Sequence, residues 1–255
     1  MKPVDESEPR SDVEGPRRWL VTLVGEWSDQ LDLADHSSIG GSVEVLSDPD
    51  DGHTAVVWAA ELDALSDPSK VMERARKIIS HMSGYAALRD PLHRPVKAGS
   101  LVELLTDGQR SACVFPEPVR VTAGVGRPRV AVTLETGIPL APDRTGEAVL
   151  AAAKPDAPHA ESVDELLTLL DDPDQTNPMV LWKMFEVIRN GKSSQWPEWF
   201  DKALEPRLRR SINDNGRHSA AEFRRRGEGP VEYFSMSEVR ATLLRLAEWW
   251  LKTVV

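Results

Sequence analysis

The sequence predicts an α+β protein, in which a largely antiparallel sheet with one long helix precedes an all-helical C-terminal part. First, short segments rich in β-branched and aromatic residues alternate with turn-forming residues between residues 17 and 136. Second, one amphipathic stripe with helical spacing interrupts these strands after Pro68. Third, apolar residues recur at helical spacing from Ser162 to the C-terminus. We therefore expect two parts of different structural class within the 255 residues.

The N-terminal part begins with a predicted strand and a predicted hairpin. Residues 19–27, with the sequence WLVTLVGEW, are rich in aromatic and β-branched residues, which favours a strand. The alternating segment 43–46 stops at a turn-forming run, Ser-Asp-Pro-Asp-Asp-Gly. Residues 54–60 follow as the expected partner strand, so this stretch predicts a β-hairpin.

A long helix is predicted next. Ser66 or Asp67 can cap it, and Pro68 suits its first turn because no backbone N–H is needed there. Gly84 is predicted to end the helix. We expect it to cover one face of the sheet with an apolar stripe that consists of Val71, Ala75, Ile78, Ile79 and Met82.

Further strands follow the helix. Residues 100–105 and 110–115 flank an Asp-Gly pair, which is a strong hairpin signal. Residues 119–123 and 129–134 alternate apolar with polar side chains and predict two more strands.

Composition sets the predicted domain boundaries. Residues 1–16 are polar and charged and have no apolar period, which predicts a disordered tail. Residues 17–136 form the predicted α+β sheet domain. Residues 137–160 hold four prolines around an alanine-rich run that could form a short helix, and we interpret them as a linker. Residues 161–255 form the predicted helical domain.

The helices of the C-terminal part have recognisable start signals. Ser162 with Glu165, and Ser235 with Glu238, have the form of capping boxes. Asn177-Pro178 is expected to begin a helix that stops at Asn190-Gly191. Further short helices are predicted over 197–204 and 206–214, with Asn215-Gly216 as a turn, and residues 219–226 are expected to form a short helix or a turn.

Composition and motifs exclude several classes of function. The 41 acidic residues outnumber the 31 Lys and Arg residues, giving a net charge of −10. No segment has the basic start and apolar run of a secretory signal, and none has the roughly 18 consecutive apolar residues of a membrane helix. Cys113 is the only cysteine, and the six histidines never fall at metal-ligand spacing. We therefore expect a cytoplasmic protein with no metal, no cofactor, no membrane contact and no catalytic residues.

The most informative feature is a basic segment on this acidic chain. Between Arg207 and Arg226 it holds seven arginines and one histidine, and two tryptophans precede it. Guanidinium groups pair bidentately with carboxylate or phosphate, so the segment predicts a site for an acidic partner. The predicted binding residues are Arg207, Arg209, Arg210, Arg217, His218, Arg224, Arg225, Trp196 and Trp199.

Three other interpretations of the same segment stay open. The arginines could bind RNA or DNA phosphates while Trp196 and Trp199 stack on bases. His218 follows Arg217 directly, so it could act as a general base in nucleotide-bond cleavage. The ordinary alternative is a solvated face, since Asp201, Glu205, Asp214 and Glu222 lie close by in the sequence and could pair with the arginines.

Several strings in the C-terminal half resemble a known group. They are LWKMFEVI over 181–188, RLRRSIN over 207–213, the Arg217-His218 pair and MSEVR over 236–240. The chain resembles a group of uncharacterised bacterial proteins with a β-rich front and a helical back, which supports the same division and implies no activity.

The helical half is also similar to HEPN domains, which are helical bundles of toxin and antiviral systems. RNase members of that family carry an Arg followed by four to six residues and then a His. Here seven residues separate Arg210 from His218, so the RNase spacing is absent. Two hypotheses result: a non-enzymatic binding or adaptor protein with an acidic partner, or a nucleic-acid-binding or RNA-cleaving protein of a defence system.

Overall fold

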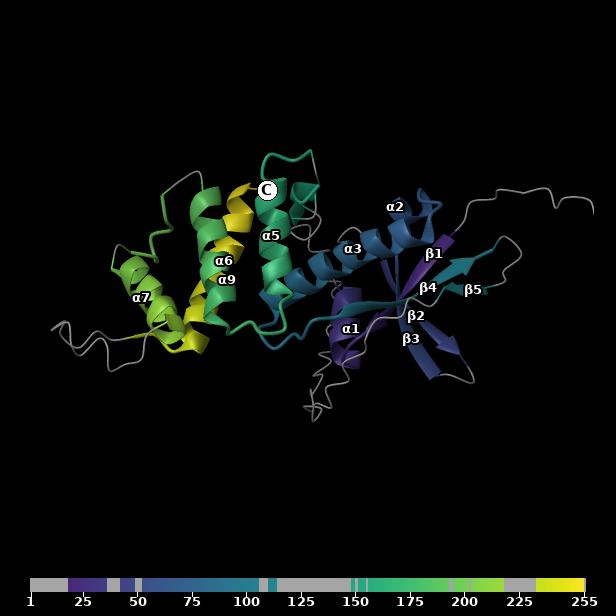
Figure 1. The fold of residues 1–255 in the computed structure, drawn as a ribbon, viewed down its shortest axis with the longest axis horizontal. Coiled ribbons are helices and arrows are strands. Elements are labelled where there is room, and N and C mark those ends of the chain that lie inside the picture. The colour runs from purple at the N-terminus through teal and green to yellow at the C-terminus, as the bar shows by residue number, and fades with distance from the viewer. Residues whose placement is uncertain are drawn as a thin grey trace, which may run out of the picture.

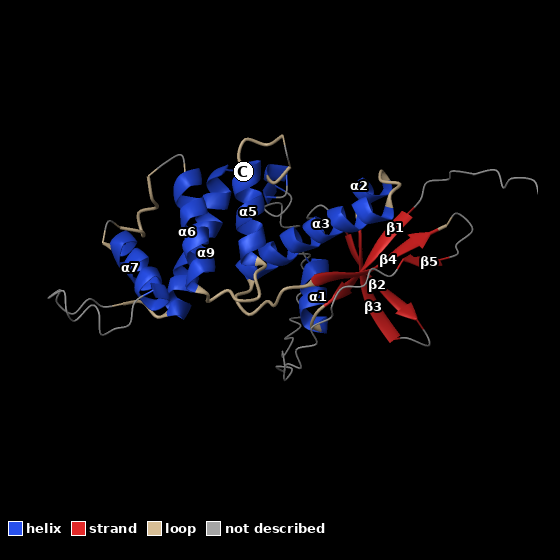
Figure 2. Ribbon diagram, in the orientation of Figure 1, coloured by secondary structure: helices blue, strands red, loops and turns tan. Residues whose placement is uncertain are grey.

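A computed structural model shows a sheet at one end of the molecule and a group of helices at the other (Figure 1). The longest helix of the N-terminal part, α3 (Pro68–Arg89), lies between them. Coloured by secondary structure, the strands and the C-terminal helices occupy separate ends (Figure 2). The structure describes residues 18–35, 42–48, 52–105, 110–113, 148–149, 151–154, 156–192, 195–201, 203–217 and 233–254.

The sheet is antiparallel throughout its described part, which confirms the predicted α+β class. Both predicted hairpins are present: Val43 faces Val57 in one, and Leu104 faces Arg110 in the other. The predicted strands 119–123 and 129–134 lie outside the described residues, as do residues 1–17. The strand order is β2-β3-β1-β4-β5, with the strands spanning β1 (Arg18–Val24), β2 (Ser42–Asp48), β3 (Gly52–Trp58), β4 (Lys97–Leu104) and β5 (Arg110–Cys113).

The first strand ends earlier than the sequence predicts. β1 stops at Val24, and the helix α1 (Trp27–Asp35) begins three residues later. The Glu26 carbonyl accepts hydrogen bonds from the backbone N–H groups of Asp29 and Gln30, both at 3.0 Å. These local bonds start a helical turn, so the aromatic residue Trp27 belongs to a helix despite its β propensity.

Helix α3 begins as predicted but does not end at Gly84. The Asp67 side chain accepts a hydrogen bond from Ser69 N at 2.9 Å, which caps the helix ahead of Pro68. The helix then continues to Arg89. A Cβ atom added at Gly84 would lie 2.1 Å from the carbonyl oxygen of Leu167, on α5 (Ala160–Leu170). Gly84 therefore permits two helices to touch and does not terminate the first. A short helix, α2 (Ala60–Asp63), precedes α3.

The C-terminal helices confirm two of the predicted start signals. Asn177 caps α6 (Pro178–Gly191) by accepting from Met179 N at 2.9 Å. Ser235 and Glu238 form a capping box ahead of α9 (Met236–Val254), since Ser235 N donates to Glu238 Oε2 and Glu238 N donates to Ser235 Oγ.

Other boundaries differ from the predictions. Helix α5 begins at Ala160, so Ser162 lies inside it and does not cap it. Residues 197–200 form a turn in which Phe200 N donates to the Pro197 carbonyl, so no helix spans 197–204. Helix α7 spans Leu204–Arg217 and runs through the predicted turn at Asn215-Gly216. The helix or turn predicted over 219–226 falls outside the described residues.

One continuous hydrophobic core joins the sheet to the C-terminal helices. It extends from Trp19 on β1 to Trp250 on α9, both of which are almost fully buried. Within the segment interpreted as a linker, Val149, Ala152 and Ala153 are buried in this core. Among the residues that the structure describes, no helix is both long and apolar enough to cross a membrane.

The contact at Gly84 predicts a large effect of a small substitution. Gly84→Ala places a methyl group against the Leu167 backbone, which cannot rotate away, so we expect the free energy of unfolding to fall by about 3 kcal/mol or more. Urea denaturation followed by circular dichroism measures this change. Gly25→Ala is the matched control, because its added Cβ meets its nearest neighbour at 3.4 Å, an ordinary contact. Equal stability of the two variants would contradict the prediction.

Candidate functional site

The described part of the predicted arginine segment lies on α7. This helix positions Arg207, Arg209 and Arg210, of which Arg210 is exposed and the other two are partly exposed. Arg217 is the last residue of α7, and its side chain is not described. The predicted binding residues His218, Arg224 and Arg225 lie outside the described residues, as does Arg226.

Six aromatic rings from α6, α9 and the turn before α7 pack together. Trp196 is central: its ring centroid lies 5.0 Å from that of Phe200, 6.0 Å from that of Phe185 and 6.1 Å from that of Trp249. Its indole N–H donates to Glu205 Oε2 at 2.9 Å. We call this set the aromatic layer, and its members are Trp182, Phe185, Trp196, Trp199, Phe200 and Trp249.

Cationic side chains cover three rings of the aromatic layer. The Arg245 guanidinium carbon lies 3.9 Å from the centroid of Trp199, and the Lys192 ammonium lies 4.5 Å from that of Trp196. Arg209 approaches Trp182 at 5.8 Å. These distances are typical of cation–π interactions. Trp196 and Trp199 thus each have a cation of the protein itself over the ring, but these cations are Lys192 and Arg245, and neither belongs to the predicted arginine segment.

Arg207 stacks on a fourth ring outside the layer. Its guanidinium carbon lies 4.1 Å from the Phe234 centroid, just before α9. The arginines of α7 therefore extend from the aromatic layer towards the start of the last helix. Sequence reasoning missed Arg245, because only the packing of α9 against the turn at Trp199 brings it to this surface.

The positive charge of three arginines on this surface is not balanced by an ion pair within the described part of the chain. Arg209, Arg210 and Arg245 make no ion pair with any residue that the structure describes. The nearby acid Glu205 accepts from Trp196, and its Oε1 lies 3.8 Å from Arg189 Nε. We call Arg207, Arg209, Arg210 and Arg245 the cationic rim.

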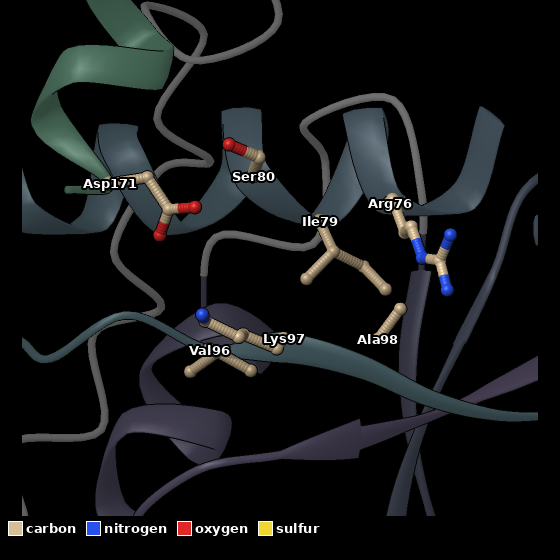
Figure 3. Close-up of a pocket in the computed structure, with 7 residues that line it drawn as sticks. All are labelled: Arg76, Ile79, Ser80, Val96, Lys97, Ala98 and Asp171. Carbon is tan, nitrogen blue, oxygen red and sulfur yellow. The ribbon is translucent and has the colours of Figure 1, made fainter. Parts of the chain in front are cut away.

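A second polar site lies between α3, the start of β4 and the end of α5. It is a hollow of about 240 Å³, and Figure 3 shows the Asp171 carboxylate directed towards its interior, with Ser80 beside it and Arg76 at the other end. The complete lining is Arg76, Ile79, Ser80, Val96, Lys97, Ala98 and Asp171.

Asp171 is the unusual group of this hollow. Its Oδ1 atom is buried and makes no hydrogen bond within the described structure. Burial raises the pKa of Asp171 to about 7, although the hydroxyl groups of Ser83 and Ser80 act in the opposite direction. A carboxyl group with this pKa can donate or accept a proton at neutral pH. Asp171 forms the C-cap of α5, a position at which an aspartate is usually part of an exposed turn. The sequence therefore does not indicate that its carboxyl group is buried.

A third polar group joins α3 to α5. His81 Nε2 lies 2.6 Å from Asp164 Oδ1, and the Lys77 ammonium lies 2.8 Å from the same oxygen. Burial lowers the pKa of His81, which favours the neutral imidazole at neutral pH. The three groups satisfy one another, and they hold the two helices together beside Gly84.

Comparisons with known proteins give no match: no protein-family model fits the chain, and neither a curated protein nor a solved structure is detectably similar to it. The resemblances to two-part bacterial proteins and to HEPN domains therefore stay predictions.

Asp171 predicts a specific pH dependence of stability. Between about pH 4 and about pH 7 the unfolded chain ionises this carboxyl group while the folded chain keeps it protonated, so stability falls as the pH rises. Asp171→Asn removes this loss, and we expect the variant to exceed the parent by on the order of 4 kcal/mol at about pH 8. At about pH 4 the two should be equally stable.

Urea denaturation at both pH values measures the difference. Asp156→Asn, which changes an exposed carboxyl group, is the control and should shift stability equally little at either pH. A constant difference between Asp171→Asn and the parent across this pH range would contradict the assignment.

Proposed function

We propose that the chain is a binding protein whose helical part recognises an acidic partner through the cationic rim. The observation that supports this most directly is the position of Arg209 and Arg245. Both stack on tryptophan rings, at 5.8 and 3.9 Å, and neither is paired with an acid among the described residues. An acidic segment of a partner protein is the ligand that these groups fit best.

The stacking matters because it reduces the entropic cost of binding. A free arginine side chain has many rotamers, and fixing them on association costs about 0.5–1.5 kcal/mol per side chain. A guanidinium group that already lies on a ring has lost part of this freedom, while its N–H donors stay directed outwards. Several such groups on one surface can then pair with carboxylates at a lower entropic cost than arginines that are free to rotate.

A protein partner is favoured over a nucleic acid by the occupied rings. Bases bind single-stranded nucleic-acid sites by stacking on aromatic faces. Here Lys192 and Arg245 already lie over Trp196 and Trp199. A nucleic-acid-binding or RNA-cleaving defence protein remains the alternative, and the same arginines would serve it.

The test compares two anionic probes of equal length, a labelled oligoglutamate and a labelled single-stranded RNA, by fluorescence anisotropy. We expect the protein to bind oligoglutamate more tightly than RNA, with an affinity that falls as salt is added. Replacing Arg209 and Arg245 together by Gln should weaken this binding about tenfold, since two charge-assisted contacts are lost. Tighter binding of RNA would favour the alternative function.

The control is Arg94→Gln, which removes an arginine that is paired with Glu26 at 3.3 Å in the N-terminal part. This variant should bind oligoglutamate as the parent does. The proposal is wrong if the parent binds neither probe at low salt, or if the control weakens binding as much as the double variant.

A further inference from the structure

We propose that Asp29, Asp32 and His93 form a binding site for one divalent transition-metal ion. One oxygen of each carboxylate and one nitrogen of the imidazole all lie within 4.8 Å of one another. His93 Nδ1 is 3.7 Å from Asp29 Oδ1 and 3.6 Å from Asp32 Oδ2. This site is separate from the cationic rim and does not depend on the proposed function.

Two structural elements bring the three residues together. Asp29 and Asp32 are three residues apart on α1, so their side chains leave the same face of the helix. His93 lies in the segment between α3 and β4. The two aspartates and the histidine are far apart in the sequence, which is why ligand spacing predicted no metal site.

The distances suit a shared ion better than direct hydrogen bonds. Both nitrogen–oxygen separations exceed the usual range of an N–H···O bond, which ends near about 3.2 Å. A nitrogen and an oxygen that each lie about 2.1 Å from one metal ion are separated by up to about 4.2 Å. The observed 3.6 and 3.7 Å therefore leave room for an ion between the imidazole and each carboxylate.

The imidazole is oriented for this role from its other side. His93 Nε2 lies 3.2 Å from Ser83 Oγ, and that oxygen accepts a hydrogen bond from Val96 N at 3.0 Å. When Nε2 carries the proton and donates to Ser83, Nδ1 presents its lone pair to the two carboxylates. Histidine ligands of metal ions are held in this way in many proteins.

Burial and charge favour a divalent cation. The His93 side chain is fully buried and that of Asp29 is 4% exposed, whereas that of Asp32 is 29% exposed. A carboxylate at a buried position, such as that of Asp29, is stabilised by an ion of charge +2. The partial exposure of Asp32 makes the site accessible to an ion from solvent.

The ligand set selects the class of ion. One imidazole nitrogen with two carboxylate oxygens suits Zn²⁺, Mn²⁺, Fe²⁺ or Co²⁺, whereas Ca²⁺ prefers oxygen ligands alone. An ion here would tie α1 to the segment that connects α3 with β4.

The chain contains a matched control. His81 and Asp164 also form a partly buried histidine–aspartate contact, but their third neighbour is the Lys77 ammonium, which repels a cation. Asp164→Asn therefore removes a carboxylate beside a histidine without touching the proposed ligands.

The experiment uses the full chain without an affinity tag, after treatment with a chelator. Co²⁺ is titrated while visible absorption is recorded, because cobalt bands report direct coordination, and Zn²⁺ is then added as a competitor. We expect one Co²⁺ per chain, displaced by Zn²⁺. Asp32→Asn should weaken binding by about tenfold or more, while Asp164→Asn leaves it unchanged.

Asp32→Asn is preferred over substitution of His93, because Asp32 is partly exposed and His93 is fully buried, so correct folding of the variant is easier to retain. Circular dichroism verifies its fold. The proposal is overturned if the parent chain fails to bind Co²⁺ stoichiometrically, if Asp32→Asn binds as tightly as the parent, or if Asp164→Asn loses binding to the same extent.

Discussion

The close approach of α3 and α5 at Gly84 is the constraint on which the rest of the structure depends. A glycine in the middle of a 22-residue helix is normally unfavourable, since alanine is the better helix former by about 1 kcal/mol. Here its lack of a side chain lets the Leu167 backbone lie against the helix. One face of α3 covers the sheet, and its C-terminal half contacts α5. This contact lies within the hydrophobic core that the sheet and the C-terminal helices share.

The elements that the sequence predicted best are those with local signals. The two hairpins have turn residues between alternating strands, and the helices after Asp67, Asn177 and Ser235 have side chains that cap them. The errors have two causes. Gly84 has the residue type of a helix end but permits a tertiary contact with α5, whereas Trp27 has β propensity but lies in a turn whose local hydrogen bonds start α1. The local sequence does not indicate which residues a glycine or a tryptophan will contact in the folded protein.

The same distinction between local sequence signals and tertiary packing applies to the candidate sites. The arginines of α7 could be identified from the sequence, because a basic segment on an acidic chain is visible in the composition. Their arrangement could not, because Arg245 reaches Trp199 from another helix and covers the ring that could have stacked on a base. The burial of Asp171, and the meeting of His93 with α1, likewise arise only when segments distant in the sequence pack together.

Ser83 connects the two polar sites on either side of α3. It is fully buried, and its hydroxyl group has one proton and two lone pairs. One lone pair accepts from Val96 N, which leaves one lone pair and one proton for His93 and Asp171. If His93 Nδ1 binds a metal ion, Nε2 must donate into the remaining lone pair. The serine proton is then available to the Asp171 carboxylate, in the direction that lowers the pKa of this group. The tautomer of His93 that donates from Nε2 is thus compatible with both sites.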